Sequence, residues 1–209
     1  MIKKIVFLFT LALMAEFLIA CCDCGNTVYT HFTYKQFEVA NLDNSGPALF
    51  VSNADSLLKT AYGIRLLSQT EVVASAAKKN FSLFLSPALA TSCECEPPFT
   101  NIPRDTVTSF SIITLSNFDN AHPAGSDITT CFKYFRNRHA SYSYYEIAFM
   151  KKLFNHFLNY TDDDGTPEDY YDLLLMVPPA QRGRYSFNVK ISLSNGKAFN
   201  LFTPEILLK

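Results

Sequence analysis

The sequence has no tryptophan, 7 glycines in 209 residues, and no excess of charge of either sign. Lysine and arginine number 18 against 19 aspartates and glutamates, which gives a formal net charge of -1. A general nucleic-acid binder needs a basic excess to neutralise phosphates, so we expect no nucleic-acid partner. The hydrophobic fraction of 48% is too high for a disordered chain, and the length suits one domain, or two small ones, with a proper core.

Recognisable catalytic motifs are also lacking. The sequence has no phosphate-binding glycine loop and no G-x-S-x-G serine elbow. None of the four histidines is spaced as in a zinc protease, and His122 precedes a proline in a predicted turn, where a structural role is expected. These absences favour a protein that is not an enzyme, and they imply no cofactor.

The first twenty residues are typical of an export signal. Lys3 and Lys4 precede an apolar run that extends to Ala20 and is interrupted only by Glu16. A membrane span needs about 20 apolar residues, and this run is shorter. We therefore predict a signal peptide over residues 1–20.

The end of this signal, Leu18-Ile19-Ala20-Cys21, resembles the lipobox of bacterial lipoproteins. The resemblance implies cleavage before Cys21, acylation of that cysteine by chains such as palmitate, and insertion of these chains among membrane lipids. Residues 21–30 would then form a lipidated tether ahead of a single globular domain over residues 31–209. An ordinary cleaved signal and an uncleaved membrane anchor are the alternatives. The lipoprotein hypothesis places the chain in the bacterial cell envelope, on the outer membrane, with either face possible.

The other cysteines form two C-x-C pairs and one single residue. Cys22 and Cys24 form the first pair, and Cys93 and Cys95 the second. An exported protein can form disulfides, so one or two disulfides among these four residues are the favoured hypothesis. A soft-metal site such as zinc is the alternative, although C-x-C is tighter than most zinc spacings. Cys131 is expected to be a buried free thiol.

Hydrophobic periodicity predicts strands and one helix. The predicted strands cover residues 34–40, 62–67, 81–85, 107–115, 171–177 and 185–193, and residues 48–51 form a short apolar run. The strand over 107–115 is apolar on both faces, which is typical of a central strand. Ser143-x-x-Glu146 resembles a capping box, and Ile147, Met150 and Phe154 fall on one face with Leu153, Phe157 and Leu158. We therefore predict an amphipathic helix over about 143–159, inserted in an antiparallel β-sandwich, immunoglobulin-like or similar.

The hairpin at the C-terminal end can be predicted in register. Val189 and Ile191 belong to an alternating strand, and Asn195-Gly196 turns the chain. A two-residue loop would put Phe199 and Leu201 on the polar face. A three-residue loop with Gly196 in the left-handed region instead pairs Ile191 with Phe199 and Val189 with Leu201. We predict the three-residue loop.

Two stretches resemble a known family. The first runs from Ala90 to Asn101 and continues in Phe118-Asp119 and His122-Pro123-Ala124-Gly125. The second is the closing hairpin around Asn195-Gly196. In these motifs the chain is similar to a family of uncharacterised Bacteroidota lipoproteins known only as a domain of unknown function. The resemblance implies an envelope lipoprotein and carries no activity.

Two sets of residues are candidates for binding. The acidic loop at Asp162-Asp163-Asp164-Gly165 does not fit an EF-hand, because tyrosines would occupy ligand positions 1 and 12. A looser calcium site formed by Asp162, Asp164 and Glu168 is a weak candidate, and a solvated loop is the favoured interpretation.

Tyrosines gather around the helix and are the best candidates for a surface that binds an envelope protein or a glycan, although half of them are expected to complete the core. They are Tyr142, Tyr144, Tyr145, Tyr160, Tyr170 and Tyr171.

The sequence thus favours a membrane-anchored envelope lipoprotein that acts as a binding or assembly module without enzymatic activity. An accessory enzyme or a sugar-binding component of an envelope uptake system is the alternative.

Overall fold

The computed structural model describes residues 28–77, 99–138, 141–155 and 170–209. The chain divides into two compact units. One comprises Met1–Thr30 and Ser75–Thr100, and the other His31–Ala74 and Asn101–Lys209. Most of the first unit lies outside the described residues, as does the predicted strand at 81–85.

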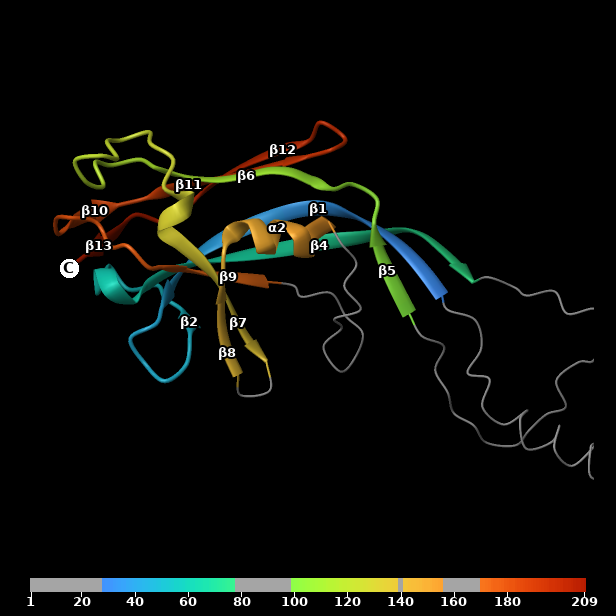
Figure 1. Ribbon diagram of the computed structural model, residues 1–209, viewed down its shortest axis with the longest axis horizontal. Coiled ribbons are helices and arrows are strands. Elements are labelled where there is room, and N and C mark those ends of the chain that lie inside the picture. Colours follow the sequence, from blue (N-terminus) through green and yellow to red (C-terminus); the bar gives the residue numbers. More distant parts are fainter. Residues whose placement is uncertain (1–27, 78–98, 139–140, 156–169) are drawn as a thin grey trace, which may run out of the picture. The chain divides into compact units, whose positions relative to one another are not determined.

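The largest sheet has seven strands (Figure 1). Its order is β2-β1-β4-β9-β7-β8, and β5 pairs with β1. Pairing is antiparallel between β1 and β2, β4 and β9, β9 and β7, and β7 and β8. The strands are β1 (Val28–Asp43), β2 (Phe50–Val51), β4 (Tyr62–Ala77), β5 (Phe99–Pro103), β7 (Phe132–Arg138), β8 (Ser141–Tyr145) and β9 (Tyr170–Leu175).

Two three-stranded sheets complete the described strands. One has the order β12-β11-β6 and contains β6 (Val107–Thr114), β11 (Phe187–Leu193) and β12 (Ala198–Phe202). The other has the order β10-β13-β3 and contains β3 (Ser56–Leu57), β10 (Gly183–Tyr185) and β13 (Ile206–Leu208), with β13 parallel to β3. Two 3-10 turns, η2 (Lys59–Ala61) and η3 (Thr129–Cys131), precede β4 and β7.

An aromatic core joins the seven-stranded sheet to the β12-β11-β6 sheet. The ring of Phe187 in β11 lies 5.5 Å from that of Tyr62 in β4 and 5.9 Å from that of Phe132 in β7. Phe37 of β1 packs edge-on against Phe199 of β12 at 4.9 Å. Such offset and edge-to-face contacts are the favoured geometries for aromatic rings. The predicted mainly β fold, built from antiparallel sheets with one helix, is confirmed.

The helix α2 (Ile147–Asn155) is shorter than predicted at its start. Ser143, the predicted cap, belongs to β8 and pairs with Arg136 of β7. The adjacent tyrosines favour a strand, and pairing with β7 satisfies the backbone there, so the helix begins four residues later. Its predicted apolar face is confirmed at Ile147, Met150 and Phe154, which are buried. The predicted residues beyond Asn155 lie outside the described part of the chain.

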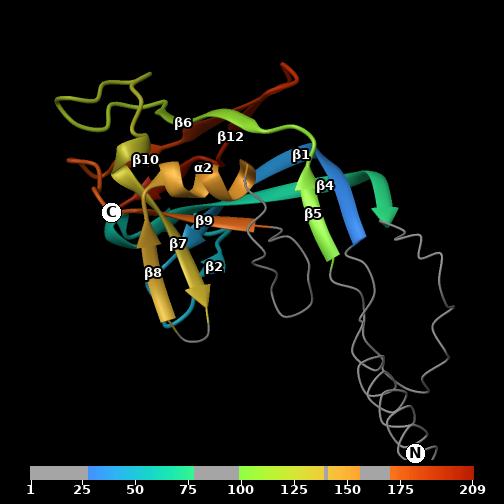
Figure 2. The same ribbon diagram turned by 45° about the vertical axis from the view of Figure 1, so that its right-hand side comes forward.

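The helix lies between β6 and the strands β7 and β9 (Figures 1 and 2). The ring of Phe154 packs 4.3 Å from that of Tyr171 and 5.7 Å from that of Tyr34. Asn155 joins the end of the helix to β6, because its side chain accepts a hydrogen bond from the backbone of Val107 and donates one back. The helix therefore extends the core between the two sheets.

The predicted hairpin is confirmed. Val189 pairs with Leu201 and Ile191 with Phe199. Gly196 has a φ of 85°, in the left-handed region, and the amide of Leu193 donates to the carbonyl of Lys197 at 2.8 Å. The hydrophobic register therefore decides the loop length, as expected.

The position predicted for residues 107–115 was wrong. Among the described strands β6 is an edge strand, and the centre of its sheet is β11. Near the end of its free edge, Ile113 forms an isolated bridge with Asp127 of the loop before η3. The backbone on this edge is therefore paired in part by a loop and not by a flanking strand.

Candidate functional site

Strand alternation divides the tyrosines around the helix into two groups. Tyr144 and Tyr145 are neighbours in β8, and Tyr170 and Tyr171 are neighbours in β9, so the members of each pair point to opposite faces of the sheet. Tyr171 is buried in the core. Tyr144 and Tyr170 have exposed fractions of 51% and 50%. Tyr144 and Tyr170, two of the candidate binding residues, thus both lie on the solvent side of the seven-stranded sheet.

Of the remaining candidate tyrosines, the structure describes the side chain of Tyr145 alone. Tyr145 is half-buried, and its ring stacks on that of Phe149 at 4.4 Å and lies 6.2 Å from that of Tyr134, so it covers the edge of the core. The side chain of Tyr142 and the whole of Tyr160 lie outside the described residues.

The solvent side of the sheet carries a row of residues in direct cross-strand register. Arg65 of β4 lies opposite Asp172 of β9, and Asp172 lies opposite Phe135 of β7. Phe135 in turn lies opposite Tyr144 of β8, with their rings 5.4 Å apart. We call this row, together with the neighbouring Tyr170, the outer sheet face: Arg65, Phe135, Tyr144, Tyr170 and Asp172.

A two-pronged ion pair fixes the centre of the outer sheet face. Arg65 Nε donates to Asp172 Oδ1 at 2.7 Å, and Arg65 Nη2 donates to Asp172 Oδ2 at 2.8 Å. These hydrogen bonds raise the pKa of Arg65 above its ordinary value. The guanidinium carbon lies 4.2 Å from the centre of the Tyr170 ring, within cation–π range. Tyr170 is therefore exposed but held in a defined position over a rigid base.

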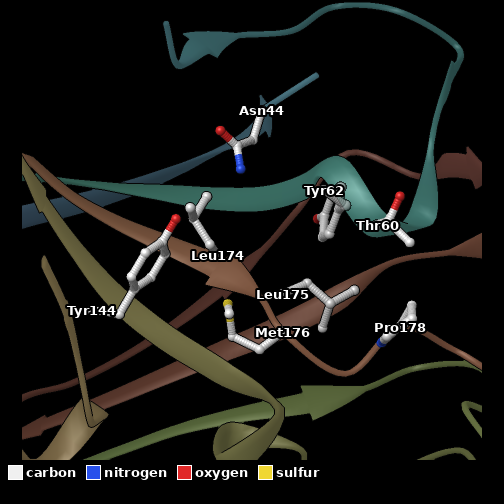
Figure 3. A pocket seen from close by; sticks show the side chains of 8 residues that line it. All are labelled: Asn44, Thr60, Tyr62, Tyr144, Leu174, Leu175, Met176 and Pro178. Atoms are coloured by element: carbon white, nitrogen blue, oxygen red, sulfur yellow. The ribbon is translucent and has the colours of Figure 1, made fainter. Parts of the chain in front are cut away.

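A cavity of about 160 Å³ adjoins the outer sheet face (Figure 3). Its inner lining is buried and largely apolar and includes Tyr62, Leu174 and Leu175. Its rim is exposed and carries the amide of Asn44, the hydroxyl of Thr60 and the ring of Tyr144, with Met176 and Pro178 also lining it. Tyr144 belongs both to the cavity and to the outer sheet face, so the two are continuous.

Backbone contacts hold the rim of the cavity in place. The backbone N–H of Asn44, just after β1, donates a hydrogen bond to the backbone carbonyl of Ala61, at the end of η2. The donor and acceptor atoms are 2.8 Å apart. This bond joins the two segments that supply Asn44 and Thr60. Beneath them the Tyr62 hydroxyl donates to Asn41 Oδ1 at 2.9 Å, and burial raises the pKa of Tyr62 well above its ordinary value. The inner wall is therefore fixed and neutral.

Sequence reasoning missed most of this site. Arg65 and Asp172 are 107 positions apart, and no local motif links them. Asn44 and Thr60 lie in segments where they resemble ordinary turn residues. The alternation rule, applied to the two tyrosine pairs, would have separated the core residues from the exposed ones.

Several other predicted residues have structural explanations. Cys131 is a buried free thiol, as predicted, and burial raises its pKa. His122 has the predicted structural role, because its Nδ1 lies 2.8 Å from Asp119 Oδ1 within the loop after β6, and this contact lowers the pKa of Asp119. In the described ranges no group of three histidine, cysteine or acidic side chains is placed to hold a metal ion.

The predicted lipid, disulfide and calcium residues lie outside the described part of the chain. They are Cys21, Cys22, Cys24, Cys93, Cys95, Asp162, Asp164 and Glu168. Of the helices that the structure describes, none combines the length and the apolar character needed to cross a membrane.

Fold and site together define a mainly β sandwich protein that presents two tyrosines to solvent on a sheet face whose centre is a largely buried ion pair. The chain belongs to the family described as "Domain of unknown function (DUF5034)", whose sequence model matches residues 34–203. The expected membership of a family without assigned function is thereby confirmed. No functionally curated protein matches the chain.

One solved structure shows a distant similarity. It is the wild-type C-terminal domain of the AgI/II polypeptide BspA of Streptococcus agalactiae, with 9% sequence identity and a TM-score of 0.26. The match covers 83% of this chain and 49% of that one, so the chain spans about half of the length of that structure. At this TM-score the similarity carries no argument about fold or function.

Proposed function

We propose that the protein is a lipid-anchored envelope module that binds a partner through the outer sheet face. One observation carries the proposal. Tyr144 and Tyr170 are about half exposed on the face of the sheet that is turned away from the core. Tyr144 ends the row formed with Arg65, Asp172 and Phe135, and the Tyr170 ring lies beside the guanidinium of Arg65. Tyrosine contributes strongly to binding surfaces, because its rigid ring offers a large contact area and its hydroxyl a polar tip.

The chemistry of this region supports binding rather than catalysis. The charged groups of Arg65 and Asp172 already satisfy each other through two hydrogen bonds. The residues lining the neighbouring cavity are all uncharged. A catalytic pocket is recognised by titratable groups that converge on one point, whereas these residues offer apolar contact and hydrogen bonds.

The anchor part of the proposal depends on the sequence. The signal over residues 1–20 and the lipobox-like Leu18-Ile19-Ala20-Cys21 support acylation of Cys21. Cells that express the chain and are fed labelled palmitate should incorporate the label into the wild-type protein and not into a Cys21→Ala variant. Equal labelling of the two proteins would contradict the anchor.

Binding is tested by removing the two exposed rings together. We expect the Tyr144→Ala/Tyr170→Ala variant to lose most binding to immobilised glycan and protein fractions of the cell envelope, measured by surface plasmon resonance. Removal of a tyrosine that is central to an interface commonly costs 2 kcal/mol or more, which corresponds to a drop in affinity of about 30-fold.

The matched control is Phe202→Ala, which removes a ring with an exposed fraction of 60% from β12, outside the seven-stranded sheet. This variant should bind as the wild type does. If Phe202→Ala weakens binding as much as the double variant does, the outer sheet face is not the binding surface.

The cavity beside Tyr144 favours one form of this function, a sugar-binding component of an envelope uptake system. Its lining combines buried apolar walls with an exposed polar rim, as ligand pockets commonly do.

A further inference from the structure

We propose that the cavity beside the outer sheet face binds a single neutral sugar ring at the end of a glycan, the rest of which lies along that face. This inference rests on the proposed function, and it adds the chemical class of the ligand and the place of its terminal residue.

The size of the cavity sets the size of the ligand. Its volume is about 160 Å³. An engineered protein cavity of about 150 Å³ holds benzene, a single six-membered ring, whereas pockets for drug-sized ligands span about 300–1,000 Å³. The cavity therefore accommodates one ring, and a longer ligand has to continue outside it.

The distribution of polar groups matches a sugar. The buried walls formed by Leu174 and Leu175 offer apolar contact to the C–H faces of a ring. On the rim, the Asn44 amide and the hydroxyls of Thr60 and Tyr144 can each donate and accept hydrogen bonds. In Figure 3 the amide nitrogen of Asn44 points into the space above Leu174 and Leu175. A ligand with an apolar ring face and several hydroxyls uses both parts of this lining.

Charge and polarity exclude the main competitors. The eight lining residues carry no charge, so a carboxylate or phosphate would lose its water without gaining an ionic partner. The nearby guanidinium of Arg65 is already held by Asp172 and covered by Tyr170. A purely apolar group, such as a phenylalanine side chain of a protein partner, would make no hydrogen bond to the three polar rim groups.

The continuity with the outer sheet face gives the glycan its direction. The ring of Tyr144 borders the cavity and lies 5.4 Å from that of Phe135. Beyond Phe135, the same row leads to Asp172, Arg65 and the ring of Tyr170. Successive sugar rings leaving the cavity would therefore pass over the rings of Tyr144, Phe135 and Tyr170.

Methionine methyl signals in NMR spectra give a direct test on the full chain. The chain has four methionines, of which Met176 lines the cavity and Met150 is fully buried in the core. Carbon-13 labelling of these methyl groups, with each signal assigned by a Met→Leu variant, provides a cavity probe and a fold probe in one spectrum. The chain is kept in a phosphocholine detergent, because detergents with sugar headgroups would compete.

The ligand probes are methyl glycosides of glucose, galactose, mannose and N-acetylglucosamine, compared with glucuronate and with N-acetyl-phenylalanine amide. At least one neutral glycoside should shift the Met176 signal in a saturable manner and leave Met150 unchanged. Thr60→Val and Asn44→Ala should each weaken this binding about fivefold, since each removes one neutral hydrogen bond. Thr130→Val, which alters an exposed threonine in the other 3-10 turn, is the matched control and should have no effect.

The outcomes separate the inference from the proposed function. If N-acetyl-phenylalanine amide or glucuronate shifts Met176 while the neutral glycosides do not, the assignment of a neutral sugar is overturned. If no probe shifts Met176 but the Tyr144→Ala/Tyr170→Ala variant loses binding to envelope fractions, the cavity site is overturned and the proposed function stands. If glycosides shift Met176 but the tyrosine variant binds envelope fractions normally, the cavity binds sugar and the outer sheet face does not extend it.

Discussion

The ion pair between Arg65 and Asp172 allows a quantitative prediction about the base of the outer sheet face. We expect Arg65→Met and Asp172→Leu each to destabilise the protein, and the double variant to be more stable than the two single effects predict. Methionine is an unbranched apolar side chain of similar length to arginine, and leucine has the branching of aspartate with methyl groups in place of the two oxygens. The cycle therefore compares the ionic contact with an apolar contact of similar shape.

The structure sets the expected magnitudes. The side chain of Asp172 has an exposed fraction of 7% and that of Arg65 19%, and two hydrogen bonds of 2.7 and 2.8 Å join them. Arg65→Met leaves a buried carboxylate without its partner and should cost about 3 kcal/mol. Asp172→Leu leaves a guanidinium that reaches solvent more easily and should cost about 2 kcal/mol. A well-packed apolar pair is often nearly neutral, so the double variant should cost at most about 2 kcal/mol, which gives a coupling of at least about 3 kcal/mol.

Urea unfolding followed by far-ultraviolet circular dichroism measures these energies, since the chain has no tryptophan to report by fluorescence. Urea is preferred to guanidinium because it is uncharged and leaves ionic contacts unscreened. The slope of the free energy against urea concentration should be the same in all four proteins. Additive effects of the two substitutions, with coupling below about 0.5 kcal/mol, would refute the view that each residue satisfies the other.

Three further predictions concern stability. Gly63→Ala should lower the free energy of unfolding by about 2 kcal/mol. The new Cβ would lie 2.8 Å from the Leu173 carbonyl oxygen and 2.8 Å from Leu174 Cδ2. An unchanged thermal midpoint would contradict this close packing. Gly196→Ala should cost about 1 kcal/mol in urea unfolding, because its φ of 85° is strained for any residue with a Cβ. Burial raises the pKa of Tyr62 above its ordinary 10.0, so its contribution to stability is complete below pH 10 and is lost as the pH rises further, by up to about 1.4 kcal/mol per pH unit. Tyr62→Phe should flatten this alkaline slope.

The parts of the fold that follow from local pattern could be predicted from the sequence. The closing hairpin has two possible loops, and only one keeps Phe199 and Leu201 on the same face as Val189 and Ile191, so hydrophobic register decides it. The helix start could not be predicted in the same way. A capping-box pattern at Ser143 competes with strand pairing to Arg136, a residue whose position is set by tertiary structure.

The candidate site was predicted only in part, for a related reason. Clustering of tyrosines along the sequence drew attention to β8 and β9, but clustering does not specify the face on which a side chain lies. Tyr170 is exposed and Tyr171 is buried because they are neighbours in one strand. The ion pair beneath Tyr170 depends on the pairing of β4 with β9, and nothing in either segment alone reveals that pairing.

The stability cycle and the binding test together separate two roles of the ion pair. If an apolar pair at positions 65 and 172 nearly preserves stability, folding alone does not explain the choice of a buried aspartate with a half-buried arginine, because burying ions is costly. The guanidinium of Arg65 lies 4.2 Å from the Tyr170 ring, and an apolar side chain provides no such cation–π contact to orient it. The Arg65→Met/Asp172→Leu variant should therefore remain folded and yet bind envelope fractions less tightly than the wild type, approaching the effect of Tyr170→Ala. Binding at wild-type strength would show that Tyr170 needs no such support, and that the ion pair serves only to join β4 to β9.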